Sequence, residues 1–370
     1  MSAILKFIRE NHILAIIEQA IAKKKSRLSL NAFEMVEIPS MLFECLDLEH
    51  LYLHKNKITI IPVELTELTN LTTLTLDYNN ITALPPEIRN LKNLVNLNLS
   101  YNPLEVLIPE IGELENLEAF WCNRIGLKEI PKEIGNLDKL DTFGARGNEL
   151  KTIPEEMTGL TKLRWLTLEN NKIETLPESM DKMEALVHCN LRNNKLQEFP
   201  ASLLNCSELM YLQLNSNLIT ALPEDFETIV SSSMEMIDLR LNPICESHYT
   251  EHPLVRYTED MPLPEVTITD LSTTPSSSSR HGAQALAINA TALRLPAVPA
   301  ARNPDPLVIE MDLDTSSVES SEDWENSVDS SELDVQYQSD DERVDNEIAQ
   351  FFQAVGMVLP ELSRYASTAS

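Results

Sequence analysis

The chain has 370 residues, of which 58 are Asp or Glu and 29 are Lys or Arg, so its formal net charge at pH 7 is −29. This acidic balance argues against non-specific binding to nucleic acid or to anionic membrane, because both require positive surface. The charge is also uneven, with 35 acidic and 23 basic residues up to Cys245 and 23 acidic and 6 basic residues from Glu246 onward. Two regions of different composition therefore share the chain.

The N-terminal segment, residues 1–27, predicts an amphipathic helix from Ser2 to Lys24, with its isoleucines largely on one side. We interpret this helix as a cap that covers the open end of the repeat array that follows it. The alternative is a helix on a membrane surface that ends in Lys23-Lys24-Lys25. Charged residues interrupt the segment too often for a bilayer span or a signal peptide, so we expect a cytoplasmic protein without stable membrane insertion.

Residues 28–245 contain a repeat with a period of 23 residues. The frame is clearest in Leu74-x-Leu76-x-x-Asn79-x-Ile81-x-x-Leu84-Pro85. The recurring asparagines are Asn56, Asn79, Asn102, Asn148, Asn171, Asn194 and Asn217, and the recurring prolines are Pro62, Pro85, Pro109, Pro131, Pro154, Pro177, Pro200 and Pro223.

Each element of the frame has a physical role. The Leu-x-Leu pair predicts a short strand whose leucines point inward while the intervening residues face out. The asparagine amide can satisfy backbone groups where the chain leaves the sheet, and the proline ends extended pairing, so a loop or short helix should follow. One coil cannot bury its own leucines, but stacked coils can. We therefore predict ten strands, which begin near Leu28, Leu51, Leu74, Leu97, Phe120, Phe143, Leu166, Cys189, Leu212 and Ile237.

Three repeats depart from the frame. Phe33 stands at the asparagine position of the first repeat and Ile125 at that of the fifth, and an insertion around Ser231-Ser232-Ser233 precedes the last. The fifth repeat also has one extra residue near Ile108. We expect a kink or a special contact at the fifth coil.

These residues resemble the Leu-Pro-x-x-Ile class of leucine-rich repeats, found in intracellular scaffolds such as Ras suppressor protein, erbin, scribble and the Sur-type Ras–Raf scaffold. The resemblance covers roughly residues 28 to 245. It implies an α/β solenoid, a leucine-rich-repeat horseshoe with a parallel concave sheet. It also implies protein-binding adaptor work, with a small GTPase or a phosphatase among the partner classes.

The outward strand positions predict the binding face, because they hold all four tyrosines and both tryptophans of the repeats. Tyr, Trp and Arg dominate interface energetics, although cross-strand aromatic pairs also stabilise a sheet by themselves. Six cations against three carboxylates in these columns predict a mildly basic face for an acidic or mixed partner surface. The candidate protein-binding residues are Tyr52, His54, Tyr78, Tyr101, Trp121, Arg124, Arg146, Trp165, Arg192, Tyr211 and Arg240.

Residues 246–347 are rich in Ser, Pro and acidic residues, a composition that predicts a disordered tail. Residues 348–362 form an apolar segment with two phenylalanines, which predicts one short amphipathic helix.

Catalytic and metal sites find little support in the sequence. The chain has only 8 Gly and no phosphate-binding loop, and Cys245, His248 and His252 lack an evident fourth metal ligand. We expect no enzyme activity, no cofactor and no metal, in a protein that is a monomer. The predicted function is a signalling adaptor or scaffold that binds a partner protein on the concave face. The alternative is a substrate-recognition subunit, or a secreted bacterial-type effector, that delivers a partner to a separate enzyme.

Overall fold

The computed structural model describes residues 3–246 and 252–258. The chain divides into two units, Met1–Thr267 and Ile268–Ser370, and every described residue belongs to the first. The helix predicted at 348–362 lies outside the described residues, as do residues 247–251 and 259–347 of the predicted tail.

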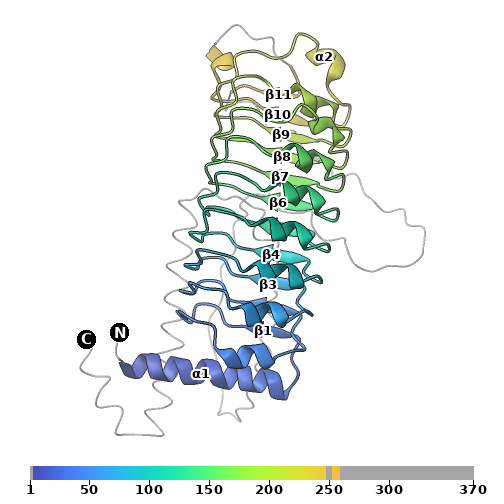
Figure 1. The fold of residues 1–370 in the computed structure, drawn as a ribbon. Coiled ribbons are helices and arrows are strands. Elements are labelled where there is room, and N and C mark those ends of the chain that lie inside the picture. The colour runs from blue at the N-terminus through green and yellow to red at the C-terminus, as the bar shows by residue number, and fades with distance from the viewer. Residues whose placement is uncertain (1–2, 247–251, 259–370) are drawn as a thin grey trace, which may run out of the picture. The chain divides into compact units, whose positions relative to one another are not determined.

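One parallel sheet of 11 strands runs through the first unit, with the strands hydrogen-bonded in chain order (Figure 1). Each strand opens one coil, and coils are numbered here by their strands. The strands are β1 Arg27–Ser29, β2 His50–Tyr52, β3 Thr73–Thr75, β4 Asn96–Asn98, β5 Ala119–Trp121, β6 Thr142–Gly144, β7 Trp165–Thr167, β8 His188–Asn190, β9 Tyr211–Gln213, β10 Met236–Asp238 and β11 Val255–Arg256.

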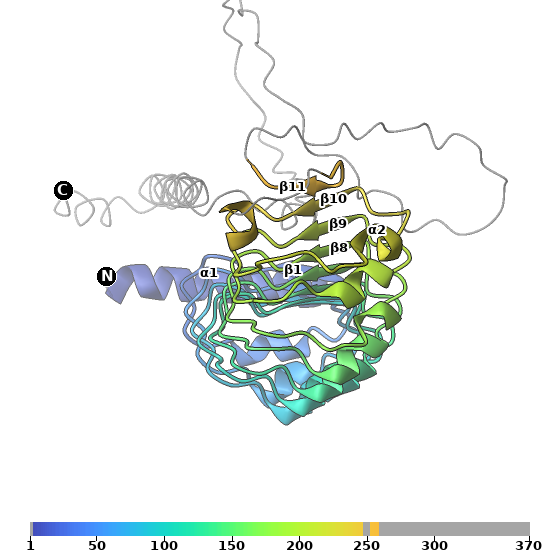
Figure 2. The same ribbon diagram turned by 90° about the horizontal axis from the view of Figure 1, so that it is seen from above.

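Short helices form the return path of the coils, on a different side of the stack from the strands (Figures 1 and 2). Most are 3₁₀ helices that begin at or directly after the repeated proline, as the fixed φ of proline favours. In coil 9 the helix is α2, Phe226–Ile229, just before the inserted serines. The 3₁₀ helices are Ser40–Glu44, Val63–Glu67, Pro86–Asn90, Pro109–Glu113, Lys132–Asn136, Glu155–Gly159, Met180–Lys182, Ala201–Asn205 and Pro243–Glu246.

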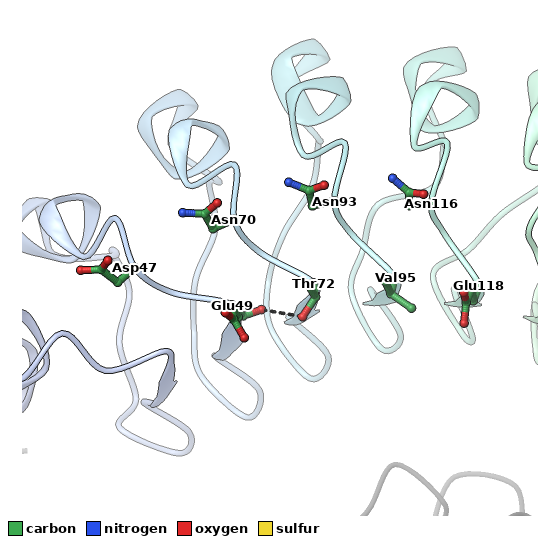
Figure 3. A pocket seen from close by; sticks show the side chains of 8 residues that line it. All are labelled: Asp47, Glu49, Asn70, Thr72, Asn93, Val95, Asn116 and Glu118. Carbon is green, nitrogen blue, oxygen red and sulfur yellow. Dashed lines mark hydrogen bonds between the residues drawn. The ribbon is translucent and has the colours of Figure 1, made fainter. Parts of the chain in front are cut away.

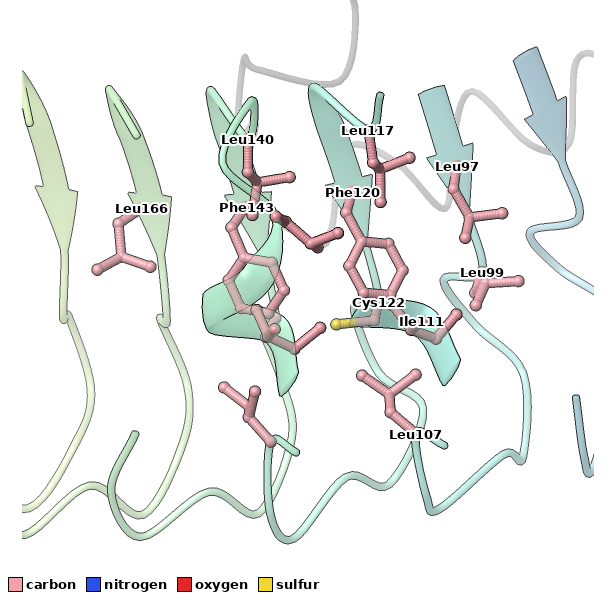
Figure 4. Packing of buried hydrophobic residues seen from close by; sticks show 14 of the residues in the cluster. Leu97, Leu99, Leu107, Ile111, Leu117, Phe120, Cys122, Leu140, Phe143 and Leu166 are labelled. Atoms are coloured by element: carbon pink, nitrogen blue, oxygen red, sulfur yellow. The ribbon is translucent and has the colours of Figure 1, made fainter. Parts of the chain in front are cut away.

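The core lies between the strands and the return path and runs the length of the stack. The inward residue of every strand from β1 to β11 is buried. Phenylalanine replaces leucine in two adjacent coils, where Phe120 and Phe143 are fully buried with ring centroids 5.7 Å apart (Figure 4). Because each side chain contacts residues of the coils before and after it, burial requires stacking.

A column of buried asparagine amides ties each coil to the one before it. Asn79 is typical: Nδ2 donates to the carbonyls of Leu53 and Leu76, each at 2.9 Å, and Oδ1 accepts from the N–H of Ile58 at 3.0 Å. The predicted role of this residue type is confirmed. The column consists of Asn56, Asn79, Asn102, Asn148, Asn171, Asn194, Asn217 and Asn242.

Coil 5 interrupts this column, as the sequence predicts. Ile125 is buried in place of an asparagine, and Oδ1 of Asn148 accepts from the N–H groups of both Ile125 and Leu127. The N–H of Glu105 donates to the carbonyl of Ile125 at 2.8 Å, whereas in coil 6 the N–H of Glu149 donates to the carbonyl of Leu127. The irregularity is therefore a local change of hydrogen-bond direction between coils 4 and 5.

The helix α1, Ala3–Ala22, lies at the β1 end of the stack (Figure 1). Ile13, Ile17 and Ala20 are buried in the same core as the leucines of coil 1. Phe33, the residue that replaces asparagine in coil 1, packs against this core and meets the ring of His12 edge-on at 5.8 Å. The apolar side of α1 is thus turned toward the first coil, where a cap would be placed.

The boundary predicted at residue 245 is too early. Val255 and Arg256 form β11, which pairs with Ile237 and Asp238 of β10, and Val255 is buried. The disordered tail predicted for 246–347 is wrong for residues 252–258. The repeat frame did not predict β11, because this strand follows β10 by 18 residues instead of 23 and no leucine pair marks it.

We expect Asn79→Ala to lower the free energy of unfolding by about 2–4 kcal/mol, because two carbonyls and one N–H in the core lose their partner. The measurement is denaturant unfolding followed by circular dichroism. The control is Asn80→Ala, an exposed amide in the same turn. Equal effects of the two substitutions would contradict the structural role of the buried amide.

Candidate protein-binding face

The outward side of the sheet carries all eleven residues predicted to bind a partner, and none of them is buried. We call this side the concave face; it comprises the outward residues of each strand and the positions up to the asparagine. Four columns hold the candidates. Trp165 and Tyr211 begin their strands; Tyr52 and Trp121 end theirs; His54, Arg146, Arg192 and Arg240 follow two residues later; and Tyr78, Tyr101 and Arg124 directly precede the asparagine position.

The column before the asparagine forms one continuous stack over coils 3 to 5. The rings of Tyr78 and Tyr101 are parallel within 11° at 4.1 Å, and Cζ of Arg124 lies 5.6 Å from the Tyr101 centroid. These three residues have φ of 52°, 56° and 50°, in the left-handed region that suits glycine or asparagine. The turn imposes this backbone conformation, and in coils 3 to 5 the residue that adopts it has a large side chain.

A second stack runs over coils 7 to 9. The ring centroids of Trp165 and His188 are 5.2 Å apart, and those of His188 and Tyr211 are 6.5 Å apart. Burial lowers the pKa of His188 to about 4, so the ring is neutral at pH 7. Burial first, and then a hydrogen bond to the Glu235 carboxylate, raise the pKa of Tyr211 to about 12. The side chains of His188 and Tyr211 are therefore both uncharged at pH 7.

Two glycines of coil 6 make room for side chains of coil 5. A methyl group at Gly144 would come within 2.9 Å of Cδ1 of Trp121, and one at Gly147 within 2.6 Å of Cγ of Arg124. The indole and the arginine stem therefore lie along the sheet, over the neighbouring coil. The sequence analysis did not predict this arrangement. A signal was present, because the chain has only 8 glycines and two of them stand at outward positions of one coil.

Two of the three carboxylates of the concave face are buried and paired with arginine. Glu169, with 5% of its side chain exposed, lies 3.4 Å from Nε of Arg146 and 4.0 Å from Nη1 of Arg192. Asp238 is likewise buried and accepts from Nε and Nη2 of Arg240, at 2.9 and 2.7 Å. The side chain of Arg192 stays 55% exposed. Cations thus stand at the surface while their counter-charges lie below it.

Asp77 is the third carboxylate of this face, and its side chain is buried. Desolvation raises its pKa to about 7, despite a backbone hydrogen bond and the charge of Lys55, which both act to lower it. Its Oδ1 has no hydrogen-bond partner in the described part of the chain. The neighbouring His54 has a pKa lowered to about 4, by burial first and by Lys55 second. This part of the face therefore carries less negative charge than the sequence suggests.

An acidic groove runs across coils 1 to 4 at the edge where the chain enters strands β2 to β5 (Figure 3). Its volume is about 490 Å³, and asparagines form its middle, each donating Nδ2 to a backbone carbonyl of the preceding coil. It is lined by Asp47, Glu49, Asn70, Thr72, Asn93, Val95, Asn116 and Glu118. The edge where the chain enters these strands is therefore acidic, whereas the candidate arginines lie beyond the ends of their strands.

The residues considered for other chemistry have structural partners. Cys45, Cys122, Cys189 and Cys206 are free and buried, and burial raises the pKa of each thiol. His252 meets Phe226 edge-on at 5.2 Å and lies 3.3 Å from Glu227, while His248 lies outside the described residues. Among the described residues, no group of three or more His, Cys, Asp or Glu is placed to hold a metal ion.

Family models match three stretches of the stack: "Leucine Rich repeats (2 copies)" over residues 46–90, "Leucine Rich Repeat" over 93–117 and "Leucine rich repeat" over 138–196. The chain is a leucine-rich-repeat protein. No curated protein sequence matches it significantly. Within the described residues, no helix has the length and apolar character needed to cross a membrane.

Solved leucine-rich-repeat structures are similar to the chain over its repeats. One is the ectodomain of the Arabidopsis thaliana receptor kinase GASSHO1/SCHENGEN3, in complex with CASPARIAN STRIP INTEGRITY FACTOR 2, at 24% identity and a TM-score of 0.52. The match covers 65% of this chain and 31% of the receptor chain. Another is the functional domain of InlJ from Listeria monocytogenes, at 23% identity and a TM-score of 0.49, covering 61% of this chain and 46% of that one. The receptor supports the solenoid fold and nothing finer.

We expect Gly144→Ala to displace the Trp121 indole from the sheet and shift its fluorescence emission to longer wavelength, because the new methyl group takes the space under Cδ1. The free energy of unfolding should change by about 1 kcal/mol or less, since the contact is with a side-chain edge. The background carries Trp165→Phe and Trp324→Phe, and Thr75→Ala is the control in the same column. An unchanged emission maximum would show that Gly144 does not seat the indole.

We expect stability to fall as pH rises toward 8 because of Asp77. The unfolded chain releases this proton near pH 3.8 and the folded chain near pH 7, so the contribution is present at low pH and is lost between these values. Between pH 5 and pH 8 wild type should lose about 2–3 kcal/mol relative to Asp77→Asn in denaturant unfolding. Asp138→Asn, at an exposed position, is the control and should retain the loss of stability seen in wild type. Retention of that loss in Asp77→Asn as well would disprove the role of the buried Asp77.

Proposed function

We propose that this leucine-rich-repeat protein is an adaptor that binds a partner protein on the concave face, without catalysing a reaction. The observation that supports this is the pair of aromatic and cationic stacks, Tyr78–Tyr101–Arg124 and Trp165–His188–Tyr211. Aromatic rings and guanidinium groups that are already held in place lose little conformational entropy on binding. The face offers such groups over coils 3 to 9.

A purely structural role for the stacks is the competing explanation, since cross-strand aromatic pairs stabilise sheets. Two observations favour binding. Left-handed positions filled by Tyr78, Tyr101 and Arg124 cost backbone free energy that glycine would avoid. Gly144 lowers the local preference for extended backbone, yet it lets the Trp121 indole lie flat. Stability alone favours neither choice.

We propose the cytoplasm as the site of action and intracellular signalling as the process. All five cysteines are free, and four are buried as small apolar groups of the core, which suits a reducing compartment. The resemblance to signalling scaffolds makes a small GTPase or a phosphatase the first partner class to test.

Site-specific photo-crosslinking in cell lysate tests this proposal. A benzophenone amino acid at Thr75 on the concave face should crosslink one defined partner, and the same group at Asn90, exposed on the return path of the same coil, should not. Tyr101→Ala with Trp165→Ala should reduce the Thr75 crosslink about tenfold or more, as expected for loss of two aromatic anchors. The double variant should keep its circular dichroism spectrum and melting cooperativity.

Two outcomes would overturn the proposal. One is a partner that crosslinks from Asn90 and not from Thr75. The other is a Thr75 crosslink that the folded double variant retains in full.

A further inference from the structure

We infer that the concave face of coils 5 to 8 is an anchor site for an anionic segment of the partner, an extended peptide that bears carboxylate or phosphate groups. The inference rests on the proposed function and names the partner chemistry of the same face. We call the site the anionic anchor, and its residues are Trp121, Arg124, Gly144, Arg146, Gly147 and Arg192.

The floor of the anionic anchor is formed by side chains that lie flat over glycine backbone. At Gly144 the space that a Cβ would occupy is taken by the Trp121 indole and the Asn123 amide, and at Gly147 it is taken by the stem of Arg124. A peptide therefore meets the indole and the arginine stem at these two positions, with no side chain of coil 6 between them and the sheet. An indole laid flat also offers a face for the apolar part of the peptide.

Positive charge surrounds this floor on three coils. Arg124 is exposed, Arg192 is 55% exposed, and Arg146 lies between them with 19% of its side chain exposed. The single carboxylate of the group, Glu169, is 5% exposed and lies beneath both Arg146 and Arg192. Three guanidinium groups against one buried carboxylate leave an excess of positive charge facing outward.

The arrangement of the arginines suits oxyanions. Glu169 holds Arg146 and Arg192 from below, and Tyr101 supports Arg124 from the side, so each guanidinium group is positioned before a ligand arrives. Planar guanidinium groups bind carboxylate and phosphate oxygens through paired N–H donors. The Nε of Arg146 is buried and lies 3.4 Å from the Glu169 carboxylate.

The size of the anionic anchor sets the length of the segment. Coils 5 and 8 are three strand spacings apart, which is about 14 Å. An extended peptide covers this distance with about four residues. Two or three anionic side chains within such a stretch would meet all three arginines.

Two other parts of the sheet do not offer the same chemistry. Arg240 in coil 10 donates Nε and Nη2 to the buried carboxylate of Asp238, and the groove of coils 1 to 4 has three carboxylates in its lining. An anionic segment is therefore attracted to coils 5 to 8 and repelled from the groove.

The test uses the full chain and two synthetic ten-residue peptides that differ only in four positions, all Glu in one and all Gln in the other. Binding is followed by Trp121 fluorescence in the Trp165→Phe, Trp324→Phe background. The Glu peptide should bind at least tenfold more tightly than the Gln peptide, and this preference should decline from 50 to 500 mM salt. Replacing the Glu residues with phosphoserine should preserve or strengthen binding.

Arg192→Gln should weaken binding of the Glu peptide about tenfold or more, and it leaves Glu169 paired with Arg146. Lys195→Gln is the matched control, because this exposed cation of the same coil lies outside the concave columns. Equal binding of the Glu and Gln peptides, or equal losses with the two variants, would overturn the anionic anchor.

The crosslinking experiment separates this inference from the proposed function. Failure of peptide discrimination with Thr75 crosslinks intact would overturn the anionic anchor and leave the concave face as the partner site. Crosslinks confined to Asn90 would overturn the proposed function, whatever the peptides do.

Discussion

The hydrogen bonds of the buried asparagine column are the constraint on which the rest of the molecule depends. Each amide joins a turn to the carbonyl of the preceding coil and accepts an N–H from it, so it fixes the position of one coil on the next. The fixed position places equivalent residues 23 apart side by side in the sheet, as in the pairing of Thr73 with Asn96. Columns of outward side chains, and the stacks within them, follow directly from this register.

Much of the fold was predictable because the repeat expresses the same physical requirement many times. Leucine spacing located ten strands, and asparagine and proline located the turns on either side of them. The eleventh strand was not predictable, since β11 is held mainly by pairing with β10 and by burial of Val255, not by a repeated frame. A single pairing leaves no period in the sequence.

The candidate site was predictable only as a set of columns. Alternation along a strand shows which residues face outward, and all eleven candidates do lie on the outward side of the sheet. It says nothing about how side chains reach across coils. The burial of Glu169 beneath two arginines and the passage of Trp121 over Gly144 are relations between coils, so they depend on three-dimensional spacing that a formal charge count omits.

The left-handed turn before each asparagine has a consequence for evolution and engineering. Coil 6 meets this turn with Gly147, while coils 3, 4 and 5 meet it with Tyr78, Tyr101 and Arg124. A repeat idealised toward glycine or asparagine would fold more readily, since it relieves backbone strain at every coil. It would also remove the stack of Tyr78, Tyr101 and Arg124. The proposed recognition groups therefore occupy turn positions with backbone strain, and a consensus version of the array should be more stable but lack them.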